Sequence, residues 1–249
     1  MKIQVRRKAT DSYQHGDLRE ALIQAGLKLL TEGGVGALSL RAAAHLAGVS
    51  HAAPYRHFPD KDALVAAIAE EGFRRLTSAM RDEVADTLNR AAATTTTAPR
   101  SPTGRKGQAR KSAPSETPTA PLSLPPFEHL RALGIGYVNF AVNHPAYLRV
   151  IFGGVAGGAV KTSGLTTAGD EAYGTLRDAV AAAAAAGALR PDDVDTLSLS
   201  CWTTVHGFSM LLVDNALPPP LSKVDAAREM VGHLMQLLFD GIREPTART

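Results

Sequence analysis

The stretch from Ser39 to Phe58 constrains the fold more than any other part of the 249-residue chain. Its apolar residues recur at helical spacing from Leu40 to Ala47, which predicts a first short helix. Ser39 can cap the start of this helix, because a Ser oxygen accepts hydrogen bonds from the free N–H groups of a first turn. Gly48 then ends it, since a residue without a Cβ atom readily adopts the left-handed conformation.

A second short helix is predicted after this corner, ending near Phe58 and stopped by Pro59. Pro54 lies inside it. A proline costs about 3 kcal/mol within a helix but much less in the first turn, so the helix should start at Ser50, His51 or slightly later. Two short helices joined by a glycine-containing corner form a helix-turn-helix.

The second helix has a polar surface that is unusual for a core helix. Ala52 and Ala53 are small enough to let its backbone approach the floor of a DNA groove. Four of its side chains can donate hydrogen bonds to phosphate oxygens or base acceptors. These donors are His51, Tyr55, Arg56 and His57. The segment is therefore predicted to read DNA.

The run Gly48-Val49-Ser50, followed by the Tyr-x-His-Phe-x-x-Lys pattern from Tyr55, resembles the DNA-binding domain of the TetR family of transcriptional regulators. The resemblance covers roughly Tyr13 to Phe73. It implies that residues near 50–53 approach bases and that Tyr55, His57 and Lys61 contact phosphates. Pro54 departs from the bulky apolar residue usual in that family. We take ten residues as candidate DNA contacts: Ser39, Arg41, Ser50, His51, Ala52, Ala53, Tyr55, Arg56, His57 and Lys61.

The net charge of +3 is unevenly distributed. Residues 1–62 carry 9 basic and 6 acidic side chains, and residues 94–126 carry 5 and 1. Residues 127–249 carry 9 and 12, which makes them a poor second nucleic-acid surface. One cysteine, no signal-peptide pattern and no apolar run of about 18 residues indicate a cytoplasmic protein without a membrane span.

Four parts are predicted along the chain. A basic disordered tail, 1–12, precedes a three-helix DNA-binding domain at 13–73, whose first helix ends at Gly33-Gly34. A long helix then runs from Lys61 past Met80, toward Asn89. Residues 94–126 contain seven Pro and seven Thr and few large apolar side chains, which predicts a disordered insertion. The fourth part is a helical ligand-binding and dimerisation domain at 127–243, so the predicted fold is all-α.

The C-terminal part should contain five helices, with a mobile Gly- and Thr-rich loop at 153–169. The corner Asn143-His144-Pro145 and the later pattern Trp202-x-x-x-His206-Gly207 resemble the WHG subtype of the TetR C-terminal domain. The expected helices span about 127–142, 146–152, 171–186, 193–217 and 222–242.

Five side chains are candidates to line a small-molecule cavity, because helical bundles often bind ligands in their interiors. They are Tyr137, Phe140, Phe152, Trp202 and His206. The alternative is that Trp202 and His206, four residues apart, only pack in the core. No cofactor, metal site or catalytic motif is expected, since the histidines lack the companions of a metal site. Cys201 is expected to be a buried, unreactive thiol.

The last two helices carry apolar residues on more than one side, which favours a dimer interface in which two helices from each subunit form a four-helix bundle. The residues expected to face outward are Phe208, Leu212, Leu234 and Leu238. The alternative is that both sides are buried inside one subunit.

Together these patterns and the resemblance predict a homodimeric repressor that binds a palindromic double-stranded operator and is released by a small-molecule effector. The ligand would shift the long helix, so that the two reading helices no longer match adjacent grooves. An activator of the same fold is one alternative. Others are a small-molecule-binding protein or enzyme with an incidental helix-turn-helix, and an architectural protein that binds DNA without sequence preference.

Overall fold

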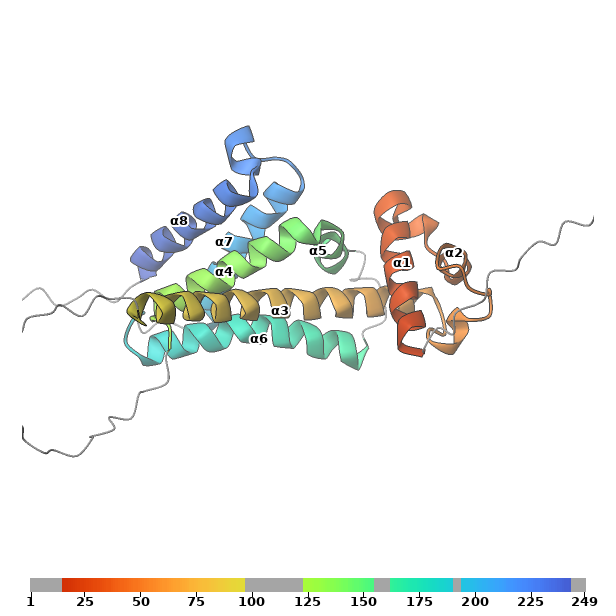
Figure 1. Cartoon of the computed structure of the whole chain (residues 1–249), viewed down its shortest axis with the longest axis horizontal. Helices are drawn as coiled ribbons and strands as arrows, with labels where there is room; N and C mark the ends of the chain where they lie inside the picture. Colours follow the sequence, from red (N-terminus) through yellow and green to blue (C-terminus); the bar gives the residue numbers. More distant parts are fainter. Residues whose placement is uncertain (1–14, 97–122, 155–161, 190–193, 243–249) are drawn as a thin grey trace, which may run out of the picture. The chain divides into compact units, whose positions relative to one another are not determined.

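The computed structural model describes residues 15–96, 123–154, 162–189 and 194–242. Every regular element in these ranges is a helix, which confirms the predicted all-α fold (Figure 1). The basic tail and most of the predicted insertion lie outside the described residues, so both stay predictions. The domain limits 13–73 and 127–243 also stay predictions.

The chain forms two compact units. The first contains residues up to Arg74 together with 144–170, and the second contains 75–143 and the residues from Glu171 onward. The boundary falls within two helices, α3 (Lys61–Thr96) and α6 (Ser163–Ala185), each of which contributes residues to both units.

The first unit is built on α1 (His15–Ala37), where Leu22 and Ile23 are fully buried. Gly34 interrupts the regular helix with φ at 68°, so the predicted break at Gly33-Gly34 is confirmed. Gly26 faces α3 closely, because a Cβ atom at this position would lie 2.9 Å from Cδ1 of Ile68.

Helix α3 starts where the sequence predicted, but it ends at a different residue. The Asp60 carboxylate accepts a hydrogen bond from the backbone N–H of Ala63 at 2.8 Å, which caps the first turn. The helix continues to Thr96 rather than ending near Asn89. The three alanines at 91–93 are strong helix formers and carry the helix into the segment that composition assigned to the insertion.

The predicted loop at 153–169 is wrong in its second half. After α5 (Pro145–Phe152), α6 begins at Ser163, eight residues earlier than expected. The hydroxyl of Thr162 accepts a hydrogen bond from the backbone N–H of Leu165 at 3.1 Å and so caps this helix, a role that Gly- and Thr-rich composition conceals. Residues 155–161 lie outside the described ranges.

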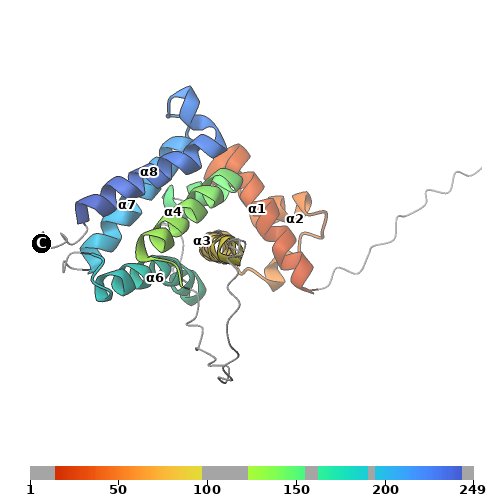
Figure 2. The same ribbon diagram turned by 60° about the vertical axis from the view of Figure 1, so that its left-hand side comes forward.

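In the second unit, α4 (Pro126–Asn143), α7 (Val194–Val213) and α8 (Val224–Ile242) pack against one another (Figure 2). Gly136 of α4 needs its bare backbone where it meets α3. A Cβ atom there would lie 2.5 Å from the carbonyl oxygen of Ala79. The fully buried side chains of this core include Leu130, Val138, Phe140, Val180 and Val231.

Helix α7 ends at Val213, before the predicted Leu217, because Asn215 adopts a positive φ of 54° and the N–H of Ala216 bonds back to the carbonyl of Leu211 at 2.8 Å. By length and composition alone α7 could cross a membrane, contrary to the expectation from sequence. Four residues of its apolar stripe, Leu197, Cys201, Val205 and Phe208, are buried in the second unit, as in a core helix of a globular domain.

One buried carboxylate joins three helices of the second unit. Glu83 of α3 is 6% exposed and accepts hydrogen bonds from Arg90 at 2.9 Å and from Asn139 of α4 at 3.0 Å. Arg228 of α8 donates to the same carboxylate at 3.2 Å. Buried charges are tolerated when they are paired and hydrogen-bonded, as this one is.

Candidate functional site

The first helix of the predicted helix-turn-helix forms as expected. It is α2 (Leu40–Leu46), and the Ser39 hydroxyl accepts a hydrogen bond from the N–H of Ala42 at 3.1 Å. Gly48 has φ at 70°, the left-handed conformation that ends the helix. Ala43 and Ala44 are fully buried, so one face of α2 is fixed in the core while Arg41 on another face is exposed.

The second helix is shorter than predicted, and its geometry differs. Only Pro54–Arg56 are helical, as the 3-10 helix η1, and residues 51–53 form turns. Pro54 has no N–H to donate to the carbonyl of Ser50, which instead accepts from the N–H of Ala53 at 3.0 Å. The carbonyl of Pro54 then accepts from the N–H groups of His57 and Phe58, both at 2.9 Å. An α-helix starting at Ser50 or His51 is therefore wrong.

Pro54 and Phe58 anchor this segment, since both are buried. The side chains between and before them face solvent, and Tyr55 is 54% exposed. Of the ten candidate DNA contacts, seven are exposed and three are half-buried. The exposed ones are Ser39, Arg41, Ser50, His51, Ala52, Tyr55 and Arg56, and the half-buried ones are Ala53, His57 and Lys61.

Lys61 has a partner that sequence reasoning missed. Its ammonium donates to the backbone carbonyl of Val35, at the end of α1, at 2.5 Å. Carbonyls at a helix C-terminus lack intrahelical partners and attract cations, which explains the contact. The side chain thus lies between the end of α1 and the first turn of α3, whose free N–H groups could also bind a phosphate.

In the second unit, three of the five predicted cavity residues come together. The hydroxyl of Tyr137 lies 2.8 Å from Nδ1 of His206, and the rings of Trp202 and His206 are 5.8 Å apart. Tyr173 of α6 adds an edge contact to Trp202 at 5.8 Å. Burial raises the pKa of Tyr137, so its hydroxyl keeps its proton, and the tautomer of His206 decides which of the two groups donates the hydrogen bond. Burial also lowers the pKa of His206.

The other two predicted residues do not join this cluster. Phe140 is 1% exposed and packs in the core of the second unit. Phe152 belongs to the first unit, where its ring meets that of Phe73 edge-on at 5.7 Å. Periodicity could not distinguish these positions, because all five side chains are aromatic and lie on helices.

An apolar cavity of about 30 Å³ lies beside Tyr137, about the space that one water molecule needs. Its lining includes Met80, Leu133, Leu176, Cys201 and Met235. Cys201 is 2% exposed, and burial raises its pKa to about 11, in line with the expected unreactive thiol. Among the described residues, no three His, Cys, Asp or Glu side chains gather as a metal site would require.

The prediction that two residues of α7 face outward is wrong. Phe208 and Leu212 are each 7% exposed and pack in the core of the second unit. Leu234 and Leu238 of α8 are half-buried. The exposed large apolar side chains on these helices are Leu199, Leu211, Val224 and Leu237, and Leu237 is 71% exposed.

Two family models match the sequence. Residues 22–68 match bacterial regulatory proteins of the tetR family, and residues 130–234 match a tetracyclin repressor-like C-terminal domain. No curated protein matches the chain.

The chain is also similar to solved structures. A protein of unknown function from Rhodococcus sp. RHA1 is 29% identical, with a TM-score of 0.67, over 94% of this chain and 100% of that one. A bacterial regulatory protein in the tetR family from Rhodococcus RHA1 is 16% identical, with a TM-score of 0.60, over 92% and 98%. PfmR, a TetR family transcriptional regulator from Thermus thermophilus, is 16% identical, with a TM-score of 0.56, over 90% and 99%. The last two show the shared fold.

Proposed function

The chain belongs to the TetR family of DNA-binding transcriptional regulators, and from this premise we propose that it is a homodimeric repressor released from a palindromic operator by a small molecule. The observation that carries the proposal is the exposed row of donors around η1, held from behind by buried Pro54 and Phe58. Exposed donors on a fixed backbone suit phosphate and base contacts.

Each chain carries one reading segment. A palindromic operator presents two half-sites about one helical turn or a multiple apart, so its recognition requires a second chain. The exposed apolar side chains of α7 and α8 support a two-fold interface on these helices. The residues we now assign to it are Leu199, Leu211 and Leu237, with Leu234 and Leu238 beside them. Phe208 and Leu212 would stabilise the interface only indirectly, from the core beneath it.

Release by an effector would act through α3. This single helix begins beside the reading segment at Lys61 and carries Met80 and Glu83 in the second unit. A ligand that separates α3 from α4 would displace the helix, and the reading segments of a dimer would no longer match adjacent grooves. The ligand must favour the displaced state for this to occur.

The test is a selection of duplexes from a random pool with the full chain, followed by titration of the enriched duplex. We expect an inverted repeat and two chains per duplex. Placed upstream of a reporter gene, this sequence should lower expression when the protein is present. If the selection recovers duplexes of random sequence, the protein binds DNA without sequence preference. If the reporter's expression rises when the protein is present, the protein is an activator.

A further inference from the structure

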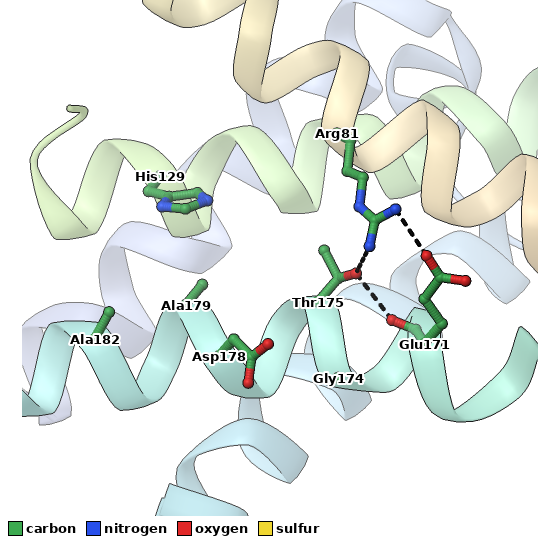
Figure 3. A pocket seen from close by; sticks show the side chains of 8 residues that line it. All are labelled: Arg81, His129, Glu171, Gly174, Thr175, Asp178, Ala179 and Ala182. Atoms are coloured by element: carbon green, nitrogen blue, oxygen red, sulfur yellow. Dashed lines mark hydrogen bonds and ion pairs between the residues drawn. The ribbon is translucent and has the colours of Figure 1, made fainter. Parts of the chain in front are cut away.

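An open cleft of about 440 Å³ lies in the second unit, between α3, α4 and α6, and neither the donors around η1 nor the aromatic cluster contributes to it. Clefts that bind small molecules commonly have volumes of about 300–1,000 Å³. Figure 3 shows the side chains that line it. Arg81 comes from α3 and His129 from α4, while the remaining six residues come from one side of α6.

One end of the cleft holds an ion pair. A guanidinium nitrogen of Arg81 lies 2.8 Å from the Glu171 carboxylate, and the other lies 3.5 Å from the hydroxyl of Thr175 (Figure 3). The side chains of Arg81 and Glu171 are 56% and 49% exposed. Their charges compensate each other, so this end contributes hydrogen-bonding groups but no net charge.

Asp178 gives the cleft its net charge. It lies on α6 two turns after Glu171, and Figure 3 joins it to none of the other lining residues. The adjacent Arg177, which is not part of the lining, is bound to Asp195 at 2.6 Å, and its pKa is raised by Asp195 and to a smaller extent by Asp178. His129 is uncharged at neutral pH, because burial lowers its pKa. With Arg81 and Glu171 cancelling, the lining carries one negative charge.

The other end of the cleft is small and apolar. Ala179 and Ala182 lie there (Figure 3). Gly174 lies toward the ion pair, next to Thr175, and a Cβ atom added to it would meet nothing within 4 Å. The apolar surface of the cleft itself is that of Ala179 and Ala182, next to the carboxylate of Asp178.

We propose that this cleft is the effector site and that its ligand is an amphipathic organic cation, an amine whose ammonium group lies at Asp178 and whose apolar body covers Ala179 and Ala182. The term effector rests on the proposed function, whereas the chemistry of the ligand rests only on the cleft. Gly174 leaves open space one turn before Asp178, beside the ion pair, and there the Arg81–Glu171 pair can orient a neighbouring hydroxyl or carbonyl group of the ligand.

The first experiment compares three probes with one carbon skeleton and different head groups, namely phenylbutylamine, phenylbutanol and phenylbutanoate, by calorimetric titration of the full chain without DNA. An ion pair with an exposed carboxylate should make the amine bind about two- to fivefold more tightly than the alcohol. The carboxylate should bind most weakly. Equal affinity for the three probes, or tighter binding of phenylbutanoate, would overturn the proposal.

Two variants locate the binding. Asp178→Asn should remove the preference for the amine over the alcohol, while Asp225→Asn, which removes one exposed carboxylate from α8, should keep it. Gly174→Leu should fill the cleft and abolish binding of the amine, whereas Gly241→Leu, at another glycine with open space around it, should not. Thermal melts confirm that each variant is folded. Undiminished amine binding by Gly174→Leu would place the ligand elsewhere and overturn the proposal.

A DNA titration separates this inference from the proposed function. If the wild-type chain binds its selected duplex and shows no head-group preference, the ligand class is wrong and the regulator stands. If it shows the amine preference and binds no duplex, the ligand chemistry stands and the proposed function fails. If both stand, the amine should release the duplex from wild type and not from Gly174→Leu, and equal release from both would overturn the effector role.

Discussion

At the scale of single residues, Lys61 has a partner in the free protein and a proposed second partner on DNA. Its ammonium bonds to the carbonyl of Val35 at 2.5 Å, while the family resemblance places it on a phosphate. The two roles are compatible because an ammonium has three donors. Holding the end of α1 would also fix the lysine near the first turn of α3, where an anion is favoured.

Lys61→Ala should therefore weaken binding to every duplex by a similar factor. It should reduce the slope of log affinity against log salt concentration by about one, because one phosphate contact releases about one counterion. Titrations at several salt concentrations measure both effects. Lys28→Ala, which removes an exposed lysine of α1 paired with Glu32 at 3.9 Å, is the matched control and should change neither. An unchanged salt slope in Lys61→Ala would contradict the phosphate contact.

Two half-buried histidines of the second unit predict how stability depends on pH. Burial lowers the pKa values of His129 and His206 below 6.5, so the unfolded chain binds these protons more tightly than the folded chain does. Their contribution to the free energy of unfolding is therefore complete above about pH 6.5 and decreases as the pH falls below it.

Urea denaturation at about pH 7.5 and about pH 5.5 measures this effect. The loss of stability on acidification should be smaller in the double variant His129→Gln/His206→Gln than in the wild type. The same double change at exposed His45 and His233 is the control and should leave the loss unaltered. An identical loss in the wild type and in the His129→Gln/His206→Gln variant would show that these side chains do not contribute.

At the scale of elements, Glu83 is the clearest joint between helices. Its buried carboxylate connects α3 to α4 through Asn139 and to α8 through Arg228. Glu83→Gln removes the negative charge that Arg90 and Arg228 contact. Their side chains are 62% and 39% exposed and stay partly hydrated, so we expect a loss of about 1–3 kcal/mol in the free energy of unfolding.

The matched control for this change is Glu128→Gln. Glu128 pairs with Arg131 at 3.4 Å on α4, where both side chains are about 40% exposed, and should contribute less than about 1 kcal/mol. Denaturant titrations of the two variants give the comparison. Equal losses would mean that the Glu83 network stabilises the unit no more than a surface pair does.

The sequence predicted most helices because their ends are marked locally. Ser39, Gly48 and Asp60 act as caps and breaks at the expected positions. The conformation of the reading segment was mispredicted because it depends on the burial of Pro54 in the tertiary structure. Pro54 fills a buried position and, lacking an N–H, leaves a 3-10 helix where the pattern suggested an α-helix. The start of α6 was missed because Thr162, its cap, lies in a stretch with loop-like composition.

The candidate sites were predicted unevenly for a similar reason. Periodicity identifies an apolar stripe on a helix but not the direction in which it faces. Phe208 and Leu212 therefore looked like an interface, and the structure places them in the core. The cleft residues Glu171, Thr175 and Asp178 recur at spacings of four and three on α6, which is a signal for one helix face. Only the fold shows that Arg81 and His129 lie opposite them.

At the scale of the whole molecule, the proposed recognition of an operator depends on the proposed dimer. Leu211→Glu with Leu237→Glu places two charges on the exposed apolar surface of α7 and α8. Both side chains are exposed in one subunit, so each subunit should stay folded, while a dimer would bury the charges without partners. We expect a monomer in sedimentation equilibrium and at least a roughly tenfold loss of operator affinity, since the monomer binds only one half-site.

Val35→Glu is the control for this pair, because Val35 is 47% exposed but lies in the first unit. It should leave the mass in solution unchanged. A dimeric double variant that still binds its operator would place the interface on another surface.

The central claim is that residues 39–61 of the first unit read a specific duplex. Hydrogen exchange of the full chain, followed by mass spectrometry, measures it most directly. Adding the selected duplex should slow exchange in peptides that cover Ser39–Lys61, and a duplex of the same composition in scrambled order should slow it much less at equal concentration. No slowing in these peptides, or slowing confined to α4 and α6, would contradict the account.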